Sequence, residues 1–330
     1  MSKTKNTDYL FLSAYIRARE ASLLNNERLE RMINAADAQE AARVLPECGY
    51  PEVSGTDDAQ LDEVFAARRA EVISEIERFG PEPALVQAFR LRYDYHNAKV
   101  LIKAEAASVD GGNLLYSCGR IKPDVLLAAF NQDDWRMIPG TFAAAIRSAR
   151  STMARSGNPQ LADIELDKAW FAEQLELAQT LSSDFYTEYI RLQIDTINLR
   201  CAVRCIRGRM DESVMKAALM DGGNIPVSRI LGHISAGVSA VFRERALASA
   251  AELGQQAIDG APLAAFEREC DNVLQRYLEK AKLIPYGPES AVAYLTSLEG
   301  EIIAVRTILL GKRSGISPEG LRERLRDCYV

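Results

Sequence analysis

The sequence predicts an all-α protein that contains a repeated helical unit. Apolar residues recur at helical spacing along almost the whole chain, and the alternation typical of strands is almost absent. Alanine, leucine, glutamate and arginine, all strong helix formers, dominate the composition, while glycine (20) and proline (12) are scarce among the 330 residues. A block of side chains in one predicted helix also recurs 101 positions later without a gap.

The repeated block combines charged, amide and apolar side chains. Its first copy consists of Arg90, Leu91, Asp94, Asn97, Lys99 and Lys103. Its second copy consists of Arg191, Leu192, Asp195, Asn198, Arg200 and Arg204. A period of 101 residues exceeds the repeat length of solenoid proteins. We therefore interpret the repeat as a duplicated helical domain.

Five helices are predicted up to the end of the first copy. Their ranges are 9–24, a helix that starts at 26, 37–45, 57–79 and 83–106. Pro46 and Pro51 follow the third helix, and Gly80 with Pro81 ends the fourth, because proline does not continue a helix. After the fifth, an Asp-Gly-Gly-Asn sequence at 110–113 predicts a helix end and a tight turn.

The second domain follows the same plan. We predict helices at 123–130, 140–155, 165–181 and 184–209. A Ser-Gly-Asn-Pro sequence at 156–159 separates the second of these helices from the third, and Ser182 or Ser183 provides the N-cap of the last one. A second Asp-Gly-Gly-Asn sequence, at 221–224, closes the domain.

A third and more diverged copy lies near the C-terminus. Glu301 takes the place of the repeated aspartate, and Arg306 takes the place of the first basic residue. Ala304 and Leu310 replace the asparagine and the second basic residue. We accordingly divide the chain into three helical repeats, at residues 1–110, 111–221 and 222–330.

Each repeated helix has an apolar face that also carries polar groups. At about 100° per residue, Asp195 and Asn198 lie on the apolar face of their helix, as Asp94 does in the first copy. A half-buried carboxylate needs a partner, and an arginine four residues before each aspartate is within reach. We therefore predict structural polar clusters that fix how neighbouring helices pack. Their members are Arg90, Asp94, Asn97, Arg191, Asp195 and Asn198.

The opposite faces of the three helices carry a basic stripe. Its members are Lys99, Lys103, Arg200, Arg204, Arg207 and Arg306. One interpretation is a solvated charged face, which is the common case. The other is a docking surface for a partner that presents acidic groups or helix ends. The second interpretation predicts these six residues as partner-binding, and the sequence leaves both open.

The overall charge argues against nucleic acid as a partner. The formal net charge is −6 and the pI is about 5.3, whereas nucleic-acid binders usually show a basic surplus. The polar N-terminus at 1–6 does not have the pattern of a signal peptide. The longest segment without an ionised side chain, 230–242, is too short to span a bilayer. We expect a cytoplasmic protein, or one that is peripheral to a membrane and not inserted in it.

Motifs of catalytic chemistry are missing from the sequence. It has no Gly-x-x-x-x-Gly-Lys-[Ser/Thr], Gly-x-Gly-x-x-Gly or His-Glu-x-x-His motif, and its two histidines provide little acid–base capacity at neutral pH. Cys201 and Cys205 lie four residues apart, but a metal site would need two further ligands, so we interpret them as small buried side chains. The sequence therefore predicts no catalytic residue, no cofactor and no metal.

Four groups of residues, taken in order, carry a resemblance to a known family. They are Ala-Tyr-Ile-Arg-Ala-Arg-Glu at 14–20 with Leu23 and Leu24, Tyr-Asp-Tyr-His-Asn-Ala-Lys at 93–99, Asp-Thr-Ile-Asn-Leu-Arg at 195–200, and Glu301 with Arg306 and the Gly-Lys pair at 311–312. In this ordered set, and in its length, the chain resembles the C subunits of the prokaryotic V-type (A-type) ATPases, which are the counterparts of the eukaryotic d subunit. The resemblance covers essentially all 330 residues.

This resemblance implies three similar helical domains in a pseudo-threefold, funnel-like arrangement. It also implies an adaptor without an active site, which links the membrane rotor ring to the central shaft and transmits torque for ATP-coupled proton or sodium transport. The implied partners are the proteolipid subunits of the ring and the subunits of the central stalk, at the cytoplasmic face of the membrane. Two alternatives stay open, a helical protein-binding scaffold unrelated to an ATPase and an enzyme whose chemistry no motif reveals.

Overall fold

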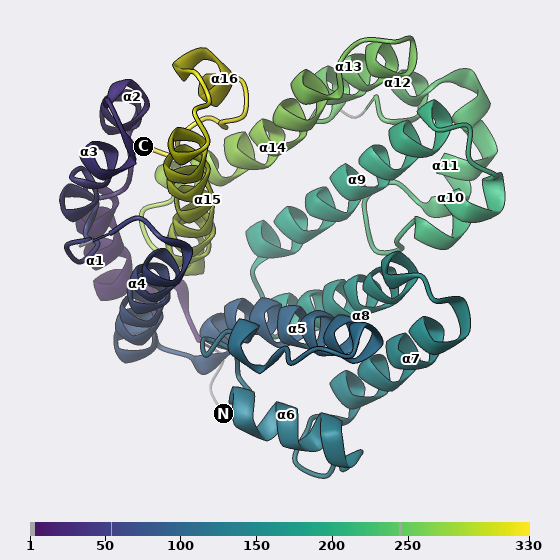
Figure 1. Ribbon diagram of the computed structural model, residues 1–330, viewed down its shortest axis with the longest axis horizontal. Coiled ribbons are helices and arrows are strands. Elements are labelled where there is room, and N and C mark those ends of the chain that lie inside the picture. The colour runs from purple at the N-terminus through teal and green to yellow at the C-terminus, as the bar shows by residue number, and fades with distance from the viewer. Residues whose placement is uncertain (1–3, 54, 244–245) are drawn as a thin grey trace. The chain divides into compact units, whose positions relative to one another are not determined.

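The computed structural model describes residues 4–53, 55–243 and 246–330 (Figure 1). Sixteen α-helices and five short 3-10 helices make up all the regular secondary structure of these ranges, in which no strand occurs. The all-α prediction is therefore confirmed. The part of the N-terminal prediction that concerns residues 1–3 lies outside the described residues.

The helices follow one another with short connections. The α-helices are α1 (Leu10–Glu20), α2 (Asn26–Asn34), α3 (Ala38–Ala42), α4 (Asp58–Phe79), α5 (Pro83–Ala107), α6 (Pro123–Gln132), α7 (Gly140–Ser156), α8 (Pro159–Thr180), α9 (Asp184–Arg207), α10 (Glu212–Ala218), α11 (Val227–His233), α12 (Val238–Val241), α13 (Ala248–Ile258), α14 (Leu263–Glu279), α15 (Pro288–Arg313) and α16 (Pro318–Arg322). The 3-10 helices are η1 (Asn6–Tyr9), η2 (Leu45–Cys48), η3 (Gly112–Leu114), η4 (Ile234–Ala236) and η5 (Lys280–Leu283).

Some predicted boundaries are wrong, and local chemistry explains one of them. Helix α8 begins at Pro159 and not at 165, because the Asn158 side chain accepts a hydrogen bond from the Gln160 amide (2.9 Å) and proline suits the first helical position. Helix α1 ends at Glu20, before the predicted end at 24. Helices α10–α14 have no counterpart among the predicted elements. The shortest of them, α12, spans too few turns to show a helical period.

The chain divides into two compact units, which are described separately. The first unit comprises the described parts of Met1–Glu82, Arg191–Leu219 and Gly223–Val330. The second unit comprises Pro83–Ile190 and Met220–Gly222.

The core of the second unit lies between its long helices. Helix α8 packs against both α5 and α7. The fully buried side chains at this junction are mostly aliphatic or aromatic and include Leu91, Leu126, Phe142, Ile146 and Leu166. Helix α8 buries Ala162, Leu166, Phe171, Gln174 and Ala178 and keeps its other residues half-buried or exposed, so it joins α5 and α7 and still carries many polar side chains.

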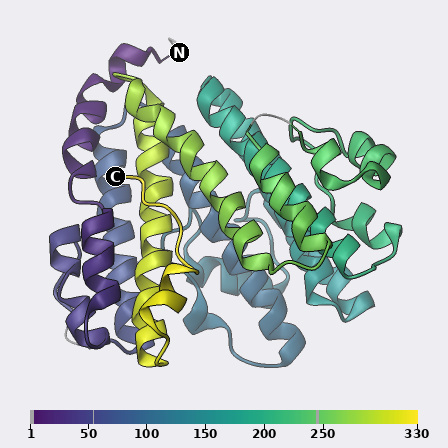
Figure 2. The ribbon, with the colours of Figure 1, turned by 90° about the horizontal axis from the view of Figure 1, so that it is seen from above.

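The first unit contains two clusters of packed helices. In one, α15 lies along α1 and α3 and also contacts α4, as the purple and yellow helices of Figures 1 and 2 show. In the other, α13 packs on α14 and both cover the C-terminal half of α9. A Cβ atom at Gly254 of α13 would lie 2.9 Å from Val203 Cγ2 and 3.1 Å from Phe266 Cε2. Glycine is therefore what allows α13 to approach so closely.

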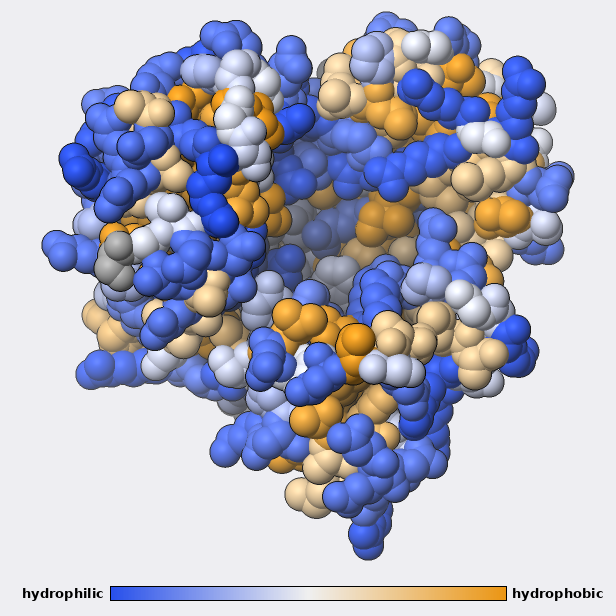
Figure 3. Space-filling view, in the orientation of Figure 1, coloured by the Kyte–Doolittle hydropathy of each residue, from blue (hydrophilic) through white to orange (hydrophobic). Residues whose placement is uncertain are grey.

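The face seen in Figure 3 is mainly hydrophilic, with hydrophobic residues scattered between. Among the residues that the structure describes, no helix is both long and apolar enough to cross a bilayer.

Candidate functional site

The three repeated helices, α5, α9 and α15, end in the same way. Each is followed by a residue in the left-handed conformation: Ser108 (φ 56°), Arg209 (φ 50°) and Gly315 (φ 71°). The next amide then donates back to a carbonyl five residues earlier: Val109 to Ala104, Met210 to Cys205 and Ile316 to Gly311. This is the Schellman type of helix end. When Asp94, Asp195 and Glu301 are aligned, Ser108, Arg209 and Gly315 align as well, so the sequence repeat and the helix ends agree.

Asp94 on α5 is fully buried and supports the loop before α6. Its carboxylate accepts hydrogen bonds from Arg120 Nε (2.6 Å) and from the Ile121 amide (3.1 Å). Burial raises the pKa of Asp94, and the bonds from Arg120 oppose this rise. Asp94 therefore forms an ion pair with Arg120, which the sequence did not indicate. Arg90 lies half-buried on the same helix.

Asp195 takes the same role on α9. Its two carboxylate oxygens accept from the amides of Asn224 (2.9 Å) and Ile225 (3.1 Å), just before α11. A Cβ atom at Gly223 would lie only 2.2 Å from Asp195 Oδ1. The loop can approach the carboxylate this closely because position 223 has no side chain. Arg191 lies exposed on α9.

Glu301 is the third buried carboxylate, on α15. It accepts from the Leu24 amide, just before α2, and from the Tyr50 hydroxyl (2.6 Å). Burial raises the pKa of Glu301 to about 7. The loop that this carboxylate supports comes from the opposite end of the chain, 277 residues away.

In all three cases the carboxylate binds the amide of a buried apolar residue that precedes a helix. This shared arrangement shows that the two Asp-Gly-Gly-Asn sequences are not equivalent in the structure. At Asp94 the glycine in contact is Gly119, whose Cβ would lie 2.4 Å from Oδ1, and it corresponds to Gly223. The first Asp-Gly-Gly-Asn sequence, at 110–113, is therefore not the structural counterpart of the second, although their letters agree.

The asparagines of the repeat are buried as predicted by their position. Asn97 bonds twice with the backbone of Tyr116, donating to its carbonyl (2.9 Å) and accepting from its amide (2.8 Å). Asn198 is fully buried on α9. Asn97 thus fixes the segment between α5 and α6 at a second point, next to the contacts of Asp94.

The basic stripe of α5 faces an acidic stripe on α8. Lys99 pairs with Asp167 (2.5 Å), and Lys103 pairs with Asp163 (2.6 Å). The two lysines and the two aspartates are each four residues apart, so both pairs form between neighbouring helical turns.

The same arrangement joins α9 to α14. Arg200 contacts both Glu267 (2.9 Å) and Asp271 (2.7 Å), and Arg204 contacts Glu267 (2.7 Å). Arg207 donates to the Ala261 carbonyl (2.7 Å). The acids again lie four residues apart, which is the sequence signal that could have revealed these pairs.

Arg306 of α15 completes the pattern, since it pairs with Asp62 of α4. All six predicted partner-binding residues therefore have a polar partner within the chain. Arg204 and Lys103 keep 62% and 47% of their side-chain surface exposed, and Arg207 is also exposed, so these three stripe residues are accessible to another protein. Whether they bind a partner stays a prediction.

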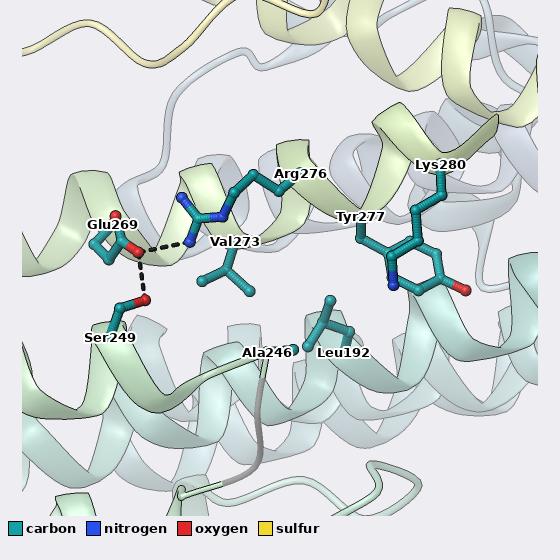
Figure 4. Close-up of a pocket in the computed structure, with 8 residues that line it drawn as sticks. All are labelled: Leu192, Ala246, Ser249, Glu269, Val273, Arg276, Tyr277 and Lys280. Carbon is teal, nitrogen blue, oxygen red and sulfur yellow. Dashed lines mark hydrogen bonds and ion pairs between the residues drawn. The ribbon is translucent and has the colours of Figure 1, made fainter. Parts of the chain in front are cut away.

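One open pocket of about 450 Å³ lies between α9, α13 and α14 in the first unit (Figure 4). Leu192 and Val273 form apolar parts of its wall. Glu269 accepts from Ser249 (2.5 Å) and from Arg276 (2.6 Å). The polar groups of the pocket thus bond largely to one another, and they do not form an acid–base pair aimed at a substrate.

The thiols of Cys201 and Cys205 lie 4.0 Å apart on α9. Within the described residues, no group of three or more histidine, cysteine or acidic side chains is arranged to hold a metal ion. Two ligands alone do not form the four-coordinate site that zinc prefers. The pair is therefore compatible with the interpretation of the thiols as packed side chains, and Cys205 belongs to the core around α9.

Comparison with known families decides the family of the chain. The sequence model of a family described as "ATP synthase (C/AC39) subunit" matches residues 12–324. The chain belongs to this family. It is thus a C-type subunit of a V/A-type ATPase complex, as the resemblance in the sequence implies.

Relatives of nearly equal length support this assignment. The chain is 26% identical to the C subunit of the V-type sodium ATPase of Enterococcus hirae, over 98% of this chain and 99% of that protein. It is 25% identical to the C subunit of the V-type ATP synthase of Thermus thermophilus, over 93% and 94% of the two chains. It is 24% identical to the C subunit of the A-type ATP synthase of Methanocaldococcus jannaschii, over 96% and 86%. The family match thus extends over the whole fold.

Proposed function

We propose that this protein is a non-catalytic adaptor of the central stalk, which links the membrane rotor ring to the central shaft and transmits torque for ATP-coupled proton or sodium transport. The observation that carries the proposal is the family match over residues 12–324. Its partners are the proteolipid subunits of the ring and the subunits of the stalk, and it acts at the cytoplasmic face of the membrane.

The internal contacts suit a part that must resist twisting. Ion pairs join α5 to α8, α9 to α14 and α15 to α4, and each buried carboxylate fixes a loop to the same long helices. Within each unit, close-packed helices with polar links between them deform little under load. Stiffness of this kind is what an adaptor between a ring and a shaft requires.

We further propose that three similar domains build the protein, in the funnel-like, pseudo-threefold arrangement that the family resemblance implies. The repeats 1–110, 111–221 and 222–330 are a first approximation to them. The carboxylate contacts favour domains that follow the helix pairs, with α15 completed by the N-terminal segment through Leu24 and Tyr50.

Reconstitution of ion transport tests the adaptor function. Membranes that contain the other ATPase subunits but lack this chain should show ATP hydrolysis without ion transport, and addition of the chain should restore transport. A fluorescent pH or sodium indicator and a phosphate-release assay measure the two activities side by side. Full transport in the absence of this chain would exclude the proposed function.

Charge exchange tests the basic stripe as a stalk-binding surface. The variant R204E/E267R moves the positive charge from α9 to α14 and allows an ion pair between the exchanged residues. It removes the contact of Glu267 with Arg200, which keeps its pair with Asp271, so a small loss of stability is expected. If Arg204 contacts the stalk, co-purification of stalk subunits should fall at least tenfold while the melting temperature stays near that of the wild type. The control R31E/E47R makes the same exchange in an exposed ion pair outside the basic stripe and should co-purify with the stalk as the wild type does. Undiminished co-purification of the R204E/E267R protein would restrict Arg204 to a structural role.

A further inference from the structure

The buried carboxylates of Asp94 and Glu301 lie at equivalent places, but the groups that donate to them differ. Asp94 bonds directly to a guanidinium group, that of Arg120. The two hydrogen bonds to the Glu301 carboxylate come from one amide, of Leu24, and one phenol, of Tyr50. Glu301 therefore has neutral donors where Asp94 has a cation.

The cations nearest to Glu301 are engaged elsewhere. Arg68 of α4 bonds to Glu71 (3.0 Å) and to the Tyr294 hydroxyl (3.3 Å). Arg28 of α2 donates to the Leu23 carbonyl (2.7 Å) and the Ala21 carbonyl (3.1 Å). Both guanidinium groups act on Glu301 only through space.

The other titratable groups around Glu301 are neutral in their usual state. They are Cys48 of η2, Tyr50, Tyr294 of α15 and Cys328 near the C-terminus. Burial raises the pKa of Cys48 to about 12 and that of Cys328 to about 11, so neither thiol ionises near neutral pH. Glu301 is thus the group of this cluster whose charge can change in that range.

Glu301 is buried where three segments of the chain meet, so its charge affects how they pack. Its residue is only 7% exposed, and its carboxylate joins α15 to the junction of α1 with α2 and to the segment after η2. These three segments come from both ends of the chain. A change of charge at this point alters the contact between them.

We propose that Glu301, together with Leu24 and Tyr50, forms a proton-responsive clasp, in which burial favours the uncharged carboxyl group and ionisation destabilises the folded protein, although the two donors bind the ionised form more strongly. The clasp affects the stability of the isolated protein. It does not depend on the proposed role in the ATPase.

The direction of the pH effect follows from burial. Desolvation raises the pKa of Glu301 to about 7, above the value of an unfolded glutamate. A group with a raised pKa contributes stability that is complete below the unfolded pKa and is lost as the pH rises through the folded pKa. The stability that Glu301 contributes to the folded protein should therefore fall from mildly acidic to neutral pH and change little at higher pH.

Carboxyl NMR measures the titration directly. In protein labelled with ¹³C at the glutamate side chains, the signal missing from Glu301→Gln identifies the Glu301 carboxyl. We expect this signal to titrate near neutral pH. A midpoint in the ordinary acidic range of glutamate would overturn the proposal.

Thermal unfolding measures the consequence for stability. Glu301→Gln mimics the uncharged form, so its melting temperature should match that of the wild type near pH 5 and exceed it above pH 8. The control Glu63→Gln alters an exposed acid of α4 and should follow the wild type at both pH values. Equal pH dependence in wild type and Glu301→Gln would overturn the proposal.

A second variant, Tyr50→Phe, tests the proposal independently in case Glu301→Gln does not fold. Tyr50→Phe removes a donor that favours the ionised carboxylate, so the Glu301 signal should titrate at a higher pH than in the wild type. For this variant the signal is assigned by comparison with the wild-type spectrum. An unchanged midpoint would show that Tyr50 is not part of the clasp and would refute the proposed arrangement.

Discussion

Gly119 and Gly223 show how single residues determine the packing of the loops on the repeated helices. A Cβ atom at Gly119 would lie 2.4 Å from Asp94 Oδ1, and one at Gly223 would lie 2.2 Å from Asp195 Oδ1. Real Cβ atoms do not approach oxygen so closely. Any side chain at these positions would displace the loop and break the amide hydrogen bonds to the buried carboxylate.

At the residue scale, Gly223→Ala should therefore destabilise the protein by about 1–3 kcal/mol through overpacking. Urea unfolding followed by circular dichroism measures the change. Gly140→Ala is the matched control, because a Cβ atom at Gly140 would meet no atom within 4 Å. Its effect should stay within about 0.5 kcal/mol. Equal stability of the two variants would show that the loop relaxes freely around residue 223.

At the element scale, the long helices are joined in pairs by ion pairs between matched stripes. In α9 and α14 the two arginines and the two acids share a spacing of four residues, so each pair lies one helical turn from the next. The members of a stripe differ in exposure, however. The Arg200 side chain is 21% exposed and contacts two acids, whereas that of Arg204 is 62% exposed and contacts one.

This difference predicts unequal effects of truncation. Arg200→Ala should lower stability by about 2 kcal/mol, because it removes partly buried, charge-assisted hydrogen bonds. Arg204→Ala should cost less than about 1 kcal/mol, as exposed pairs do. Thermal unfolding of both variants at low and high salt compares them, and salt should reduce only the smaller effect. A larger loss for Arg204→Ala would contradict the order given by burial.

At the scale of the whole molecule, the two units differ in which parts of the chain build them. The second unit is almost continuous, from Pro83 to Ile190, and has its own core between α5, α7 and α8. The first unit combines the beginning of the chain with its end, since α15 packs against α1, α3 and α4. The second unit can therefore fold from one continuous segment, whereas the first unit needs both ends of the chain.

We accordingly expect a fragment of residues 83–190 to fold by itself. It should show a helical circular dichroism spectrum and a cooperative thermal transition. In a fragment of residues 191–330 the cluster of α9, α13 and α14 keeps its partners, but α15 should be protected from hydrogen exchange only when a fragment of residues 1–82 is added, because its main packing partners lie there. Full protection of α15 in the fragment 191–330 alone would show that the N-terminal helices are dispensable for this unit.

Several features could be predicted from the sequence because they depend on local spacing. Helical periodicity indicated the all-α fold and the long helices, and the repeat in register indicated which positions of α5, α9 and α15 are equivalent. The burial of Asp94, Asp195 and both asparagines followed from their place on the apolar faces. The family followed from motifs at fixed places in the sequence.

The sequence by itself thus determined the all-α class, the repeated helices and the family, since these follow from local spacing and motifs, whereas α10–α14 became evident only in the structure. Only the tertiary structure decided which groups meet: Arg120 at Asp94, the acids of α8 and α14 at the basic stripe, and Leu24 at Glu301. These partners lie between 26 and 277 residues from the groups they bind. Helical periodicity shows which face of a helix is buried, but the course of the chain through space selects what covers that face.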